Sequence, residues 1–514
     1  MTPKTLFRVA LFSLFLASIS SAAEKRPNIL FFFTDDQAYD TLGVYGNPDV
    51  KTPNIDRLGQ NGVVFERHYN TTAICMASRA NVMTGLYEYK TGCNFTHGPT
   101  GEEQWASSYP ILLKQAGYRT GFGGKFGFHV SADGSVPGKD TEGDRAKRDF
   151  DFWVGGPGQT NFKTKANPSL AKYAKDYPHS SRAYGAATID FMRESVKTGK
   201  PFCMSVFYKA PHRPIQPDPK FDDVYRDTTF RKLPNYGREA GEHFSKHSQL
   251  GRQYPRFVDW GYSEEESYQK ALRKYHQLIY GVDYSIGMIL DELERLGIAD
   301  NTVVIFSSDN GYFNGSHGLG SKVLPYEEGA RVPLIVYDPR HPQSGEMRRY
   351  GKLSANVDIT ATILDLAGVE TPKHYDGRSL LPAIRDTENR VRKTLPVLQI
   401  WGPEETRCMT IVSEDYKYIY WYYKDESQGL KPTEELYHMA KDPYELQNVA
   451  NHPEHSVALK NMRQRYDKQL AHMKSQGVSN NGYAEYRLLF DRTASWSKKK
   501  KALADRAPAA ESLK

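Results

Sequence analysis

Continuous apolar runs recur along the chain and predict buried strands. Residues 28–34 read Asn-Ile-Leu-Phe-Phe-Phe-Thr, and comparable runs occupy 201–208 and 302–308. Unbroken apolar runs of this length are typical of parallel strands that are covered on both faces. Helical patterns fill the intervening sequence, the longest over 264–296. This alternation predicts an α/β fold in which helices flank a large, mixed, mostly parallel sheet.

The pattern changes after about residue 390. Residues 409–423 alternate and are rich in tyrosine, which predicts an antiparallel hairpin, and 456–475 have the period of an amphipathic helix. We therefore divide the chain into a leader, a large α/β domain, a smaller C-terminal subdomain of antiparallel sheet plus helix, and a basic tail that we expect to be disordered. Their bounds are 1–23, 24–390, 391–490 and 491–514.

Two further segments carry signals of location and of loop structure. Residues 1–23 combine a basic start, an apolar run and a small-residue end, which is the pattern of a secretory signal peptide. No later stretch is apolar for long enough to span a bilayer. We expect an exported protein, periplasmic or secreted. Residues 131–171 are rich in Gly, Pro, Lys and Asp and predict an insertion or lid.

Composition narrows the choice of partners. The net charge of +7 is concentrated in the leader and the tail, and the sequence between them is nearly neutral. The composition therefore gives no sign of a basic face, and we expect no nucleic-acid partner. Four cysteines, Cys75, Cys93, Cys203 and Cys408, are too few for a disulfide scaffold in a chain of 514 residues. A bridge between Cys75 and Cys93 stays open at this stage.

Polar residues follow three of the predicted strands. Asp35-Asp36 ends the first, His212 follows the second, and Asp309-Asn310 ends the third. Parallel strands bring their carboxyl ends to one edge of a sheet, where ligands usually bind. Carboxylate and amide oxygens favour calcium or magnesium over zinc, and an adaptable set of this kind leans to calcium. The alternative for Asp35-Asp36 is a solvated strand end with an N-cap.

A cysteine and an arginine mark the start of a predicted helix. Cys75 lies at or just before the helix, where backbone N–H groups favour negative charge, and Arg79 lies one turn on. With Lys125, His212 and Lys322 these residues predict a cationic, metal-centred pocket. A multiply charged oxyanion suits such a pocket, so phosphate or sulfate esters are the natural substrates.

With these motifs in view, the chain resembles the type I sulfatases of the alkaline phosphatase superfamily from Pro27 to about Asn451. The resemblance lies in the order and spacing of NILFFFTDDQ, TPNIDRL, CMASRANVMTG, GGKFGFH, KAPHRP, SDNG, SHGLGSKVLPYEEGARVP, NVDITATILDLAGV and ELYHMAKDPYELQNV. It implies that a maturation enzyme oxidises Cys75 to formylglycine. The hydrated aldehyde would attack sulfur, and the covalent sulfate would then collapse to regenerate the aldehyde.

The resemblance also implies roles for the other residues. Arg79 would fix the formylglycine, and one calcium ion would be held by Asp35, Asp36, the oxygen at position 75, Asp309 and Asn310. Lys125, His212 and Lys322 match residues that grip the sulfate and the leaving oxygen. Arg213 and His317 are expected either to contact substrate or to order their loops. The substrate would be a sulfated carbohydrate.

Two positions depart from the family pattern. Ala77 stands where the family has proline, and Gly127 stands where a histidine usually follows the lysine. His129 is the expected replacement for that histidine. Two alternatives remain beside the sulfatase: a phosphate- or phosphonate-ester hydrolase on the same fold, and an inactive relative that binds sulfated glycans. A Cys75 that stays a thiol would favour the second.

Overall fold

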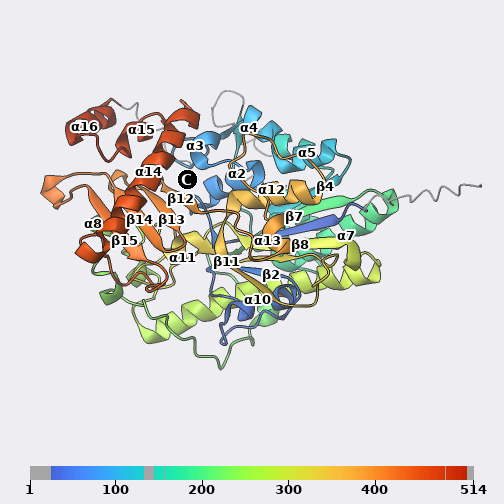
Figure 1. Ribbon diagram of the computed structural model, residues 1–514. Coiled ribbons are helices and arrows are strands. Elements are labelled where there is room, and N and C mark those ends of the chain that lie inside the picture. The colour runs from blue at the N-terminus through green and yellow to red at the C-terminus, as the bar shows by residue number, and fades with distance from the viewer. Residues whose placement is uncertain (1–24, 132–143, 157, 481, 506–514) are drawn as a thin grey trace, which may run out of the picture.

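The computed structural model describes residues 25–131, 144–156, 158–480 and 482–505 (Figure 1). The predicted signal peptide lies outside the described residues. Within them, no helix combines the length and apolar character needed to cross a membrane.

A large sheet runs through the described part of the chain. Its nine strands follow the order β11 (Arg348–Ala355), β2 (Val63–Tyr69), β10 (Leu334–Tyr337), β8 (Thr302–Ser308), β1 (Asn28–Asp35), β7 (Phe202–Pro211), β4 (Arg119–Lys125) and β6 (Phe152–Gly156), with β9 (Arg331–Val332) paired to β2. Only β9 and β10 pair antiparallel to their neighbours. The predicted mixed, mostly parallel sheet is confirmed.

Strand β1 shows why the apolar runs are unbroken. Leu30 and Phe32 pack into the core on one face of the sheet, whereas Phe31 and Phe33 pack into the core on the other. Alternate side chains of a strand point to opposite faces, so a central strand covered on both sides must be apolar throughout. The predicted strands at 28–34, 201–208 and 302–308 correspond to β1, β7 and β8.

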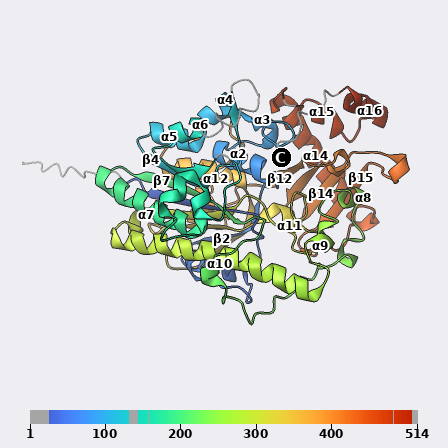
Figure 2. The same ribbon diagram turned by 180° about the vertical axis from the view of Figure 1, so that it is seen from behind.

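Helices cover both faces of the large sheet (Figures 1 and 2). One face packs against α1 (Pro53–Gln60), α7 (Ser180–Thr198) and α10 (Glu265–Arg295). The other packs against α2 (Cys75–Thr84), α5 (Tyr109–Gln115), α12 (Asn356–Leu366) and α13 (Leu381–Arg385). Short elements connect these layers: α3 (Glu88–Thr91), β3 (Thr100–Gly101), α4 (Glu102–Ala106), β5 (Val130–Ser131), α6 (Asp144–Asp149), α8 (Lys246–Gln249), α9 (Arg256–Asp259) and α11 (Glu327–Ala330).

A second, antiparallel sheet forms the C-terminal part. It contains β12 (Thr394–Gln399), β13 (Cys408–Ser413), β14 (Tyr416–Trp421) and β15 (Thr433–His438), and α14 (Ser456–Gln476) packs on it. The predicted hairpin is β13–β14, and the predicted amphipathic helix is α14. In Figure 1 this sheet and α14 lie together at one end of the large sheet.

Two local predictions are wrong. The segment 131–171 is not simply an insertion, because its β6 joins the large sheet beside β4. The tail is not wholly disordered either, since α16 (Trp496–Ala504) lies in it, after α15 (Tyr486–Leu489) at the end of the C-terminal subdomain. Lys499 anchors α16: its side chain is buried, and Nζ donates to the Tyr420 hydroxyl at 2.9 Å over that ring. An aliphatic stem and aromatic partners replace the apolar content that the tail lacks.

Candidate active site

The carboxyl ends of four parallel strands meet at one edge of the large sheet. Register pairs Asp35 of β1 with Pro211 of β7, and Thr34 with Ser308 of β8. Lys125 ends β4, one strand beyond β7. The residues predicted from the strand ends therefore lie close together. Asp36 continues from β1 with a left-handed backbone (φ 69°), which is unusual for a residue other than glycine and typical of functional turns.

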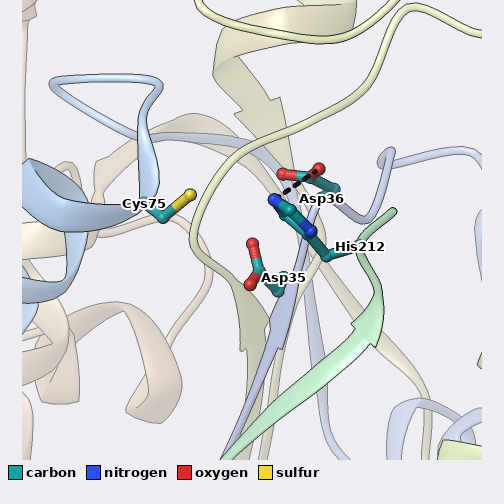
Figure 3. A group of neighbouring side chains, drawn as sticks. All are labelled: Asp35, Asp36, Cys75 and His212. Carbon is teal, nitrogen blue, oxygen red and sulfur yellow. Dashed lines mark ion pairs between the residues drawn. The ribbon is translucent and has the colours of Figure 1, made fainter. Parts of the chain in front are cut away.

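Cys75 is the first residue of α2, and its side chain faces these strand ends. Figure 3 shows its sulfur pointing toward Asp35, Asp36 and His212, and ligand atoms of these four residues lie within 4.8 Å of one another. Lys322 Nζ lies 2.8 Å from Cys75 Sγ and pairs with Asp36. All four cysteines are free, so the Cys75–Cys93 bridge is not formed.

Three buried cations balance three buried carboxyl groups. Arg79 Nε donates to Asp309 Oδ2 at 2.8 Å, and Arg79 Nη1 donates to the Lys125 carbonyl at 2.7 Å. Lys125 Nζ donates to Asp35 Oδ2 at 2.6 Å. Because the groups are withdrawn from water, their mutual positions decide which stay charged.

The pKa values follow from this packing. Burial alone would raise the pKa of Asp35, but Lys125, His212, Arg79 and Lys322 outweigh it and hold the pKa well below its usual range. Burial, reinforced by the Asp35 charge, raises the pKa of Asp309 to about 7. Burial lowers the pKa of His212 to about 4 against the pull of Asp35 and Asp36. His212 is therefore neutral near pH 7, with Nε2 3.8 Å from Asp36 Oδ2.

Several oxygens in this cluster could hold a cation. Asp35 Oδ1 and Asn310 Oδ1 are buried and have no hydrogen-bond partner among the described residues. Asn310 Nδ2 donates to Asp36 Oδ1 at 2.7 Å, which places the amide beside the carboxylates. Asp309 lies with them, because its Oδ1 accepts from the Asp36 backbone N–H at 3.2 Å. Buried acceptors without donors fit a hard divalent cation.

Comparison with known proteins adds to this geometry. The family model described as Sulfatase matches residues 27–369, and one described as N-sulphoglucosamine sulphohydrolase, C-terminal, matches 315–474. The chain belongs to the sulfatase family. As a sulfatase it is an enzyme, a sulfuric ester hydrolase, and its two-sheet architecture is that of its structural neighbours.

Named relatives cover most of this sulfatase. It is 28% identical to an N-acetylglucosamine-6-O-sulfatase of Bacteroides thetaiotaomicron over 90% of each chain, and 30% identical to human N-acetylgalactosamine-6-sulfatase over 71% of this chain and 67% of the human one. A solved structure in complex with its substrate D-glucosamine-2-N,6-O-disulfate has a TM-score of 0.69 at 26% identity, covering 88% of this chain and 99% of that one.

The two departures from the family pattern have local explanations. A Cβ atom on Gly127 would lie 2.7 Å from Arg79 Cδ, and the backbone there has φ 82°. A larger side chain, histidine included, does not fit this backbone. Ala77 is the third residue of α2, where a backbone N–H has no helical partner, so alanine and proline both suit the position.

The environment of His317 favours one of the two roles expected for it, ordering its loop. His317 is 2% exposed; its Nε2 lies 2.9 Å from Asn235 Nδ2, and its Nδ1 lies 3.1 Å from the Ala240 carbonyl. It orders its loop, which was the alternative reading. Arg213, in contrast, is partly exposed and stacks on Trp260. The His129 carbonyl accepts from Thr100 N–H at 2.9 Å, and its catalytic role stays a prediction.

Sequence reasoning missed three cations near Cys75. Lys209 lies within β7, with burial lowering its pKa to about 8 and with the charges of Asp35 and Lys125 acting on it. Arg252 and Arg256 come from the long polar segment between β7 and α10. No motif marks Arg252 or Arg256, and the KAPHRP motif that begins at Lys209 draws attention to His212 and Arg213 instead. Only the tertiary structure brings them to the site.

Proposed function

We propose that this sulfatase is exported and hydrolyses sulfate esters of carbohydrates, using a formylglycine made from Cys75 and one calcium ion. The observation that carries the proposal is the position of Cys75, at the first turn of α2 and within 4.8 Å of ligand atoms of Asp35, Asp36 and His212. The carbohydrate substrate is supported by the amino-sugar sulfatases among the relatives. The predicted leader supports export.

The state of Cys75 supports conversion rather than direct use of the sulfur. Burial raises the pKa of the thiol, and this outweighs the favourable charges of Lys125 and Lys322. Reactive thiols usually have a lowered pKa, so a thiolate nucleophile is disfavoured here. A formylglycine would instead supply a hydrate whose oxygen attacks the sulfate ester.

The donor set supports calcium. The metal ligands that Asp35, Asp36, Asp309 and Asn310 offer are all oxygens, and two of these oxygens are buried without a hydrogen-bond partner among the described residues. We infer that these side chains and the oxygen at position 75 hold the ion. Bound calcium would offset negative charge on the sulfate oxygens.

The side chains of the site would then share the remaining work. Arg79 donates hydrogen bonds to Asp309 and to the Lys125 carbonyl. It thereby fixes the start of α2, where position 75 lies, relative to the end of β4. Lys125 and Lys322 would hold the sulfate oxygens. His212 is the proposed acid for the departing alcohol oxygen; because it is neutral near pH 7, it must first take up a proton, which the negative charges of Asp35 and Asp36 favour. His129 is the proposed base that would take the proton from the remaining hydroxyl of position 75, so that the carbon–oxygen bond to sulfate breaks and the aldehyde forms again. Sulfate would leave with the hydrate oxygen, and water would hydrate the aldehyde for the next turnover.

Two alternative functions remain to be tested: a phosphate- or phosphonate-ester hydrolase on the same fold, and an inactive relative that binds sulfated glycans. A phosphonate monoester hydrolase of Agrobacterium radiobacter has a TM-score of 0.70 to this chain at 22% identity, which shows the shared fold alone. Phosphonate monoesters therefore belong in the assay. An inactive glycan-binding protein would keep an intact thiol at Cys75.

Mass spectrometry of the tryptic peptide from His68 to Arg79 tests the proposal first. The protein is expressed with a formylglycine-generating enzyme, and we expect the mass of the aldehyde or its hydrate at Cys75. Sulfate release from a panel of sulfated sugars should then depend on that modification. Cys75→Ala should reduce turnover by roughly a thousandfold or more while the protein stays folded.

Metal removal tests the proposed calcium ion separately from the proposed formylglycine. A chelator should abolish turnover and lower the melting temperature, and calcium should restore both more fully than magnesium, because binding to the native state stabilises it. An unmodified thiol with no sulfate release would contradict the function. Faster cleavage of phosphonate monoesters than of any sulfate would favour the other hydrolase.

A further inference from the structure

Three arginines lie beside the sulfate site, and no carboxylate of the described residues pairs with them directly. They are Arg213, which follows His212 after β7, and Arg252 and Arg256, which lie around the start of α9. Among the described residues, none of the three forms an ion pair. Arginine is rarely left unpaired near other cations, because like charges repel and burial disfavours charge. A ligand anion would remove this imbalance.

Tryptophan rings hold the three guanidinium groups in place. Arg213 and Arg256 both stack on Trp260, each with Cζ 4.3 Å from the ring centroid, and Arg252 stacks on Trp401 at 3.9 Å. Cation–π stacking fixes the plane of a guanidinium and leaves its N–H edges free to bind an anion. All three arginines and both tryptophans are partly exposed, so a ligand can reach them.

Hydrogen bonds tie this segment to the loop that carries Lys322. Gln253 Nε2 donates to the Lys322 carbonyl at 2.7 Å, and its own carbonyl accepts from Gly320 N–H at 2.8 Å. Arg256 Nη1 donates to Ser321 Oγ at 3.1 Å. The arginines are therefore positioned relative to Lys322, which touches Cys75.

The charges that act on these arginines indicate that they lie close to Cys75 and Asp36. Burial and the neighbouring Arg256 lower the pKa of Arg252 to about 10, while Cys75 and Asp36 oppose that shift. Burial also lowers the pKa of Arg256, with Arg213 adding to the effect. Trp401, on which Arg252 stacks, packs against the cluster of Ile74, Ala77 and Val323 next to Cys75. Like-charge crowding at a partly open site is a signature of ligand binding.

We propose that Arg213, Arg252 and Arg256 form an anion subsite that binds a second anionic group of the substrate, a sulfate or a carboxylate, next to the ester that is cleaved. The inference rests on the proposed function, because it assumes that the sulfate ester binds at Cys75. It narrows the substrate class to carbohydrates that carry at least two negative charges on one sugar or on adjacent sugars.

Binding of matched sugars tests the subsite. Protein made without the maturation enzyme keeps the Cys75 thiol and cannot turn over, so calorimetry measures affinity alone. The probes are N-acetylglucosamine 6-O-sulfate, D-glucosamine-2-N,6-O-disulfate, and a disaccharide that joins N-acetylglucosamine 6-O-sulfate to a uronate. We expect the dianionic probe that fits to bind at least about tenfold tighter than the monosulfate, and to change the fluorescence of the stacked tryptophans. If the disulfate gains more affinity over the monosulfate, the subsite binds a sulfate. If the uronate disaccharide gains more, the subsite binds a carboxylate.

Variants decide whether the arginines cause this preference. Arg252→Gln and Arg256→Gln should each reduce the dianion-to-monoanion affinity ratio about tenfold, and Arg252→Lys should recover only part of it because it lacks the planar fork. Arg226→Gln is the matched control: Arg226 lies in the same segment, is 67% exposed and pairs with Asp223, so the ratio should be unchanged.

Two results would overturn the subsite: affinities for mono- and dianions within threefold of each other, or a preference that survives in both glutamine variants. Absence of binding by every probe also counts against it. Failure of the function looks different. A protein that prefers dianions but never acquires the aldehyde or releases sulfate would keep the subsite and lose the proposed reaction.

Discussion

Gly127 lies at a point where the site has no room for a side chain. Its position between Lys125 and Phe128 brings its backbone against Arg79, so that an added Cβ would meet Arg79 Cδ at 2.7 Å and Lys125 Cε at 3.3 Å. Arg79 in turn donates to Asp309 and to the Lys125 carbonyl. The glycine therefore controls where the arginine lies.

Gly127→Ala should impair catalysis by displacing Arg79. We expect a loss of unfolding free energy of about 1–3 kcal/mol, because alanine is strained at positive φ and the contact must be relieved, and a fall in kcat/KM of about tenfold or more. Thermal unfolding and sulfate release measure the two effects. Gly199→Ala is the control, since Gly199 has φ 67° with no atom within 4 Å of an added Cβ. Equal loss of activity in both variants would contradict the steric argument.

At the scale of helices and strands, the sequence predicts those elements whose formation depends on the local pattern of apolar and polar residues. Strands β1, β7 and β8 are visible as apolar runs because they are buried on both faces, and their shared edge brings Asp35, His212 and Asp309 together. Strand β6 is five residues long in a polar segment, and only its pairing with β4 makes it a strand. Helix α16 depends on Lys499 and the distant Tyr420.

Side-chain roles were predictable only where a motif marked them. The local sequence singles out Cys75, Arg79, Lys125 and Lys322, the family resemblance implies their roles, and the structure brings all four together. His317 shares a motif with Lys322, yet burial against Asn235 gives it a structural role. The role proposed for Arg252 and Arg256 depends on stacking against Trp401 and Trp260. Nothing in the sequence pattern links these tryptophans to the arginines. Long-range packing, rather than periodicity, decides such cases.

Lys417 joins the two sheets through a buried ion cluster. It lies on β14, and its Nζ is 2.7 Å from Glu327 Oε1 at the start of α11 and 2.8 Å from Glu445 Oε1. All three side chains are buried, and α11 follows the loop that carries Lys322. Burial, with the nearby charges of Glu327 and Glu328, raises the pKa of Glu445 to about 8 even with Lys417 present.

Lys417→Met should destabilise the protein by about 3–5 kcal/mol, because it removes the cation nearest to two buried carboxyl groups and leaves Glu327 only the more distant Arg331. Chemical denaturation measures the loss. Lys424→Met removes an exposed pair with Glu426 and should cost less than about 1 kcal/mol. Adding Glu445→Gln to Lys417→Met should recover part of the loss. A small effect of Lys417→Met, comparable to that of the control, would contradict the role of the cluster.

At the scale of the whole molecule, the C-terminal part folds back onto the start of the chain. Glu88 of α3 is buried and accepts hydrogen bonds from Asn94 Nδ2 at 2.7 Å and from the Tyr483 hydroxyl at 2.5 Å. Tyr483 lies between α14 and α15, so this contact joins segments that are 395 residues apart. Burial raises the pKa of Glu88 to about 7.

This pKa makes the stability of the whole fold depend on pH. In the unfolded chain Glu88 ionises near its ordinary pKa of 4.5, whereas in the folded protein it keeps its proton up to about pH 7. The folded state therefore binds more protons between these values, and stability from this group falls as pH rises through that window, by at most roughly 3 kcal/mol.

Glu88→Gln should remove this loss, because glutamine keeps the acceptor oxygen and cannot ionise. The melting temperature of the wild type minus that of the variant should be more negative at pH 8 than at pH 5. Glu194→Gln, at a 55%-exposed carboxylate paired with Arg119, should leave the pH profile of the wild type unchanged. If Glu88→Gln follows the wild-type profile as closely as Glu194→Gln does, the buried carboxyl is ionised in the folded protein, and the contact with Tyr483 must then be a charged hydrogen bond rather than a neutral one.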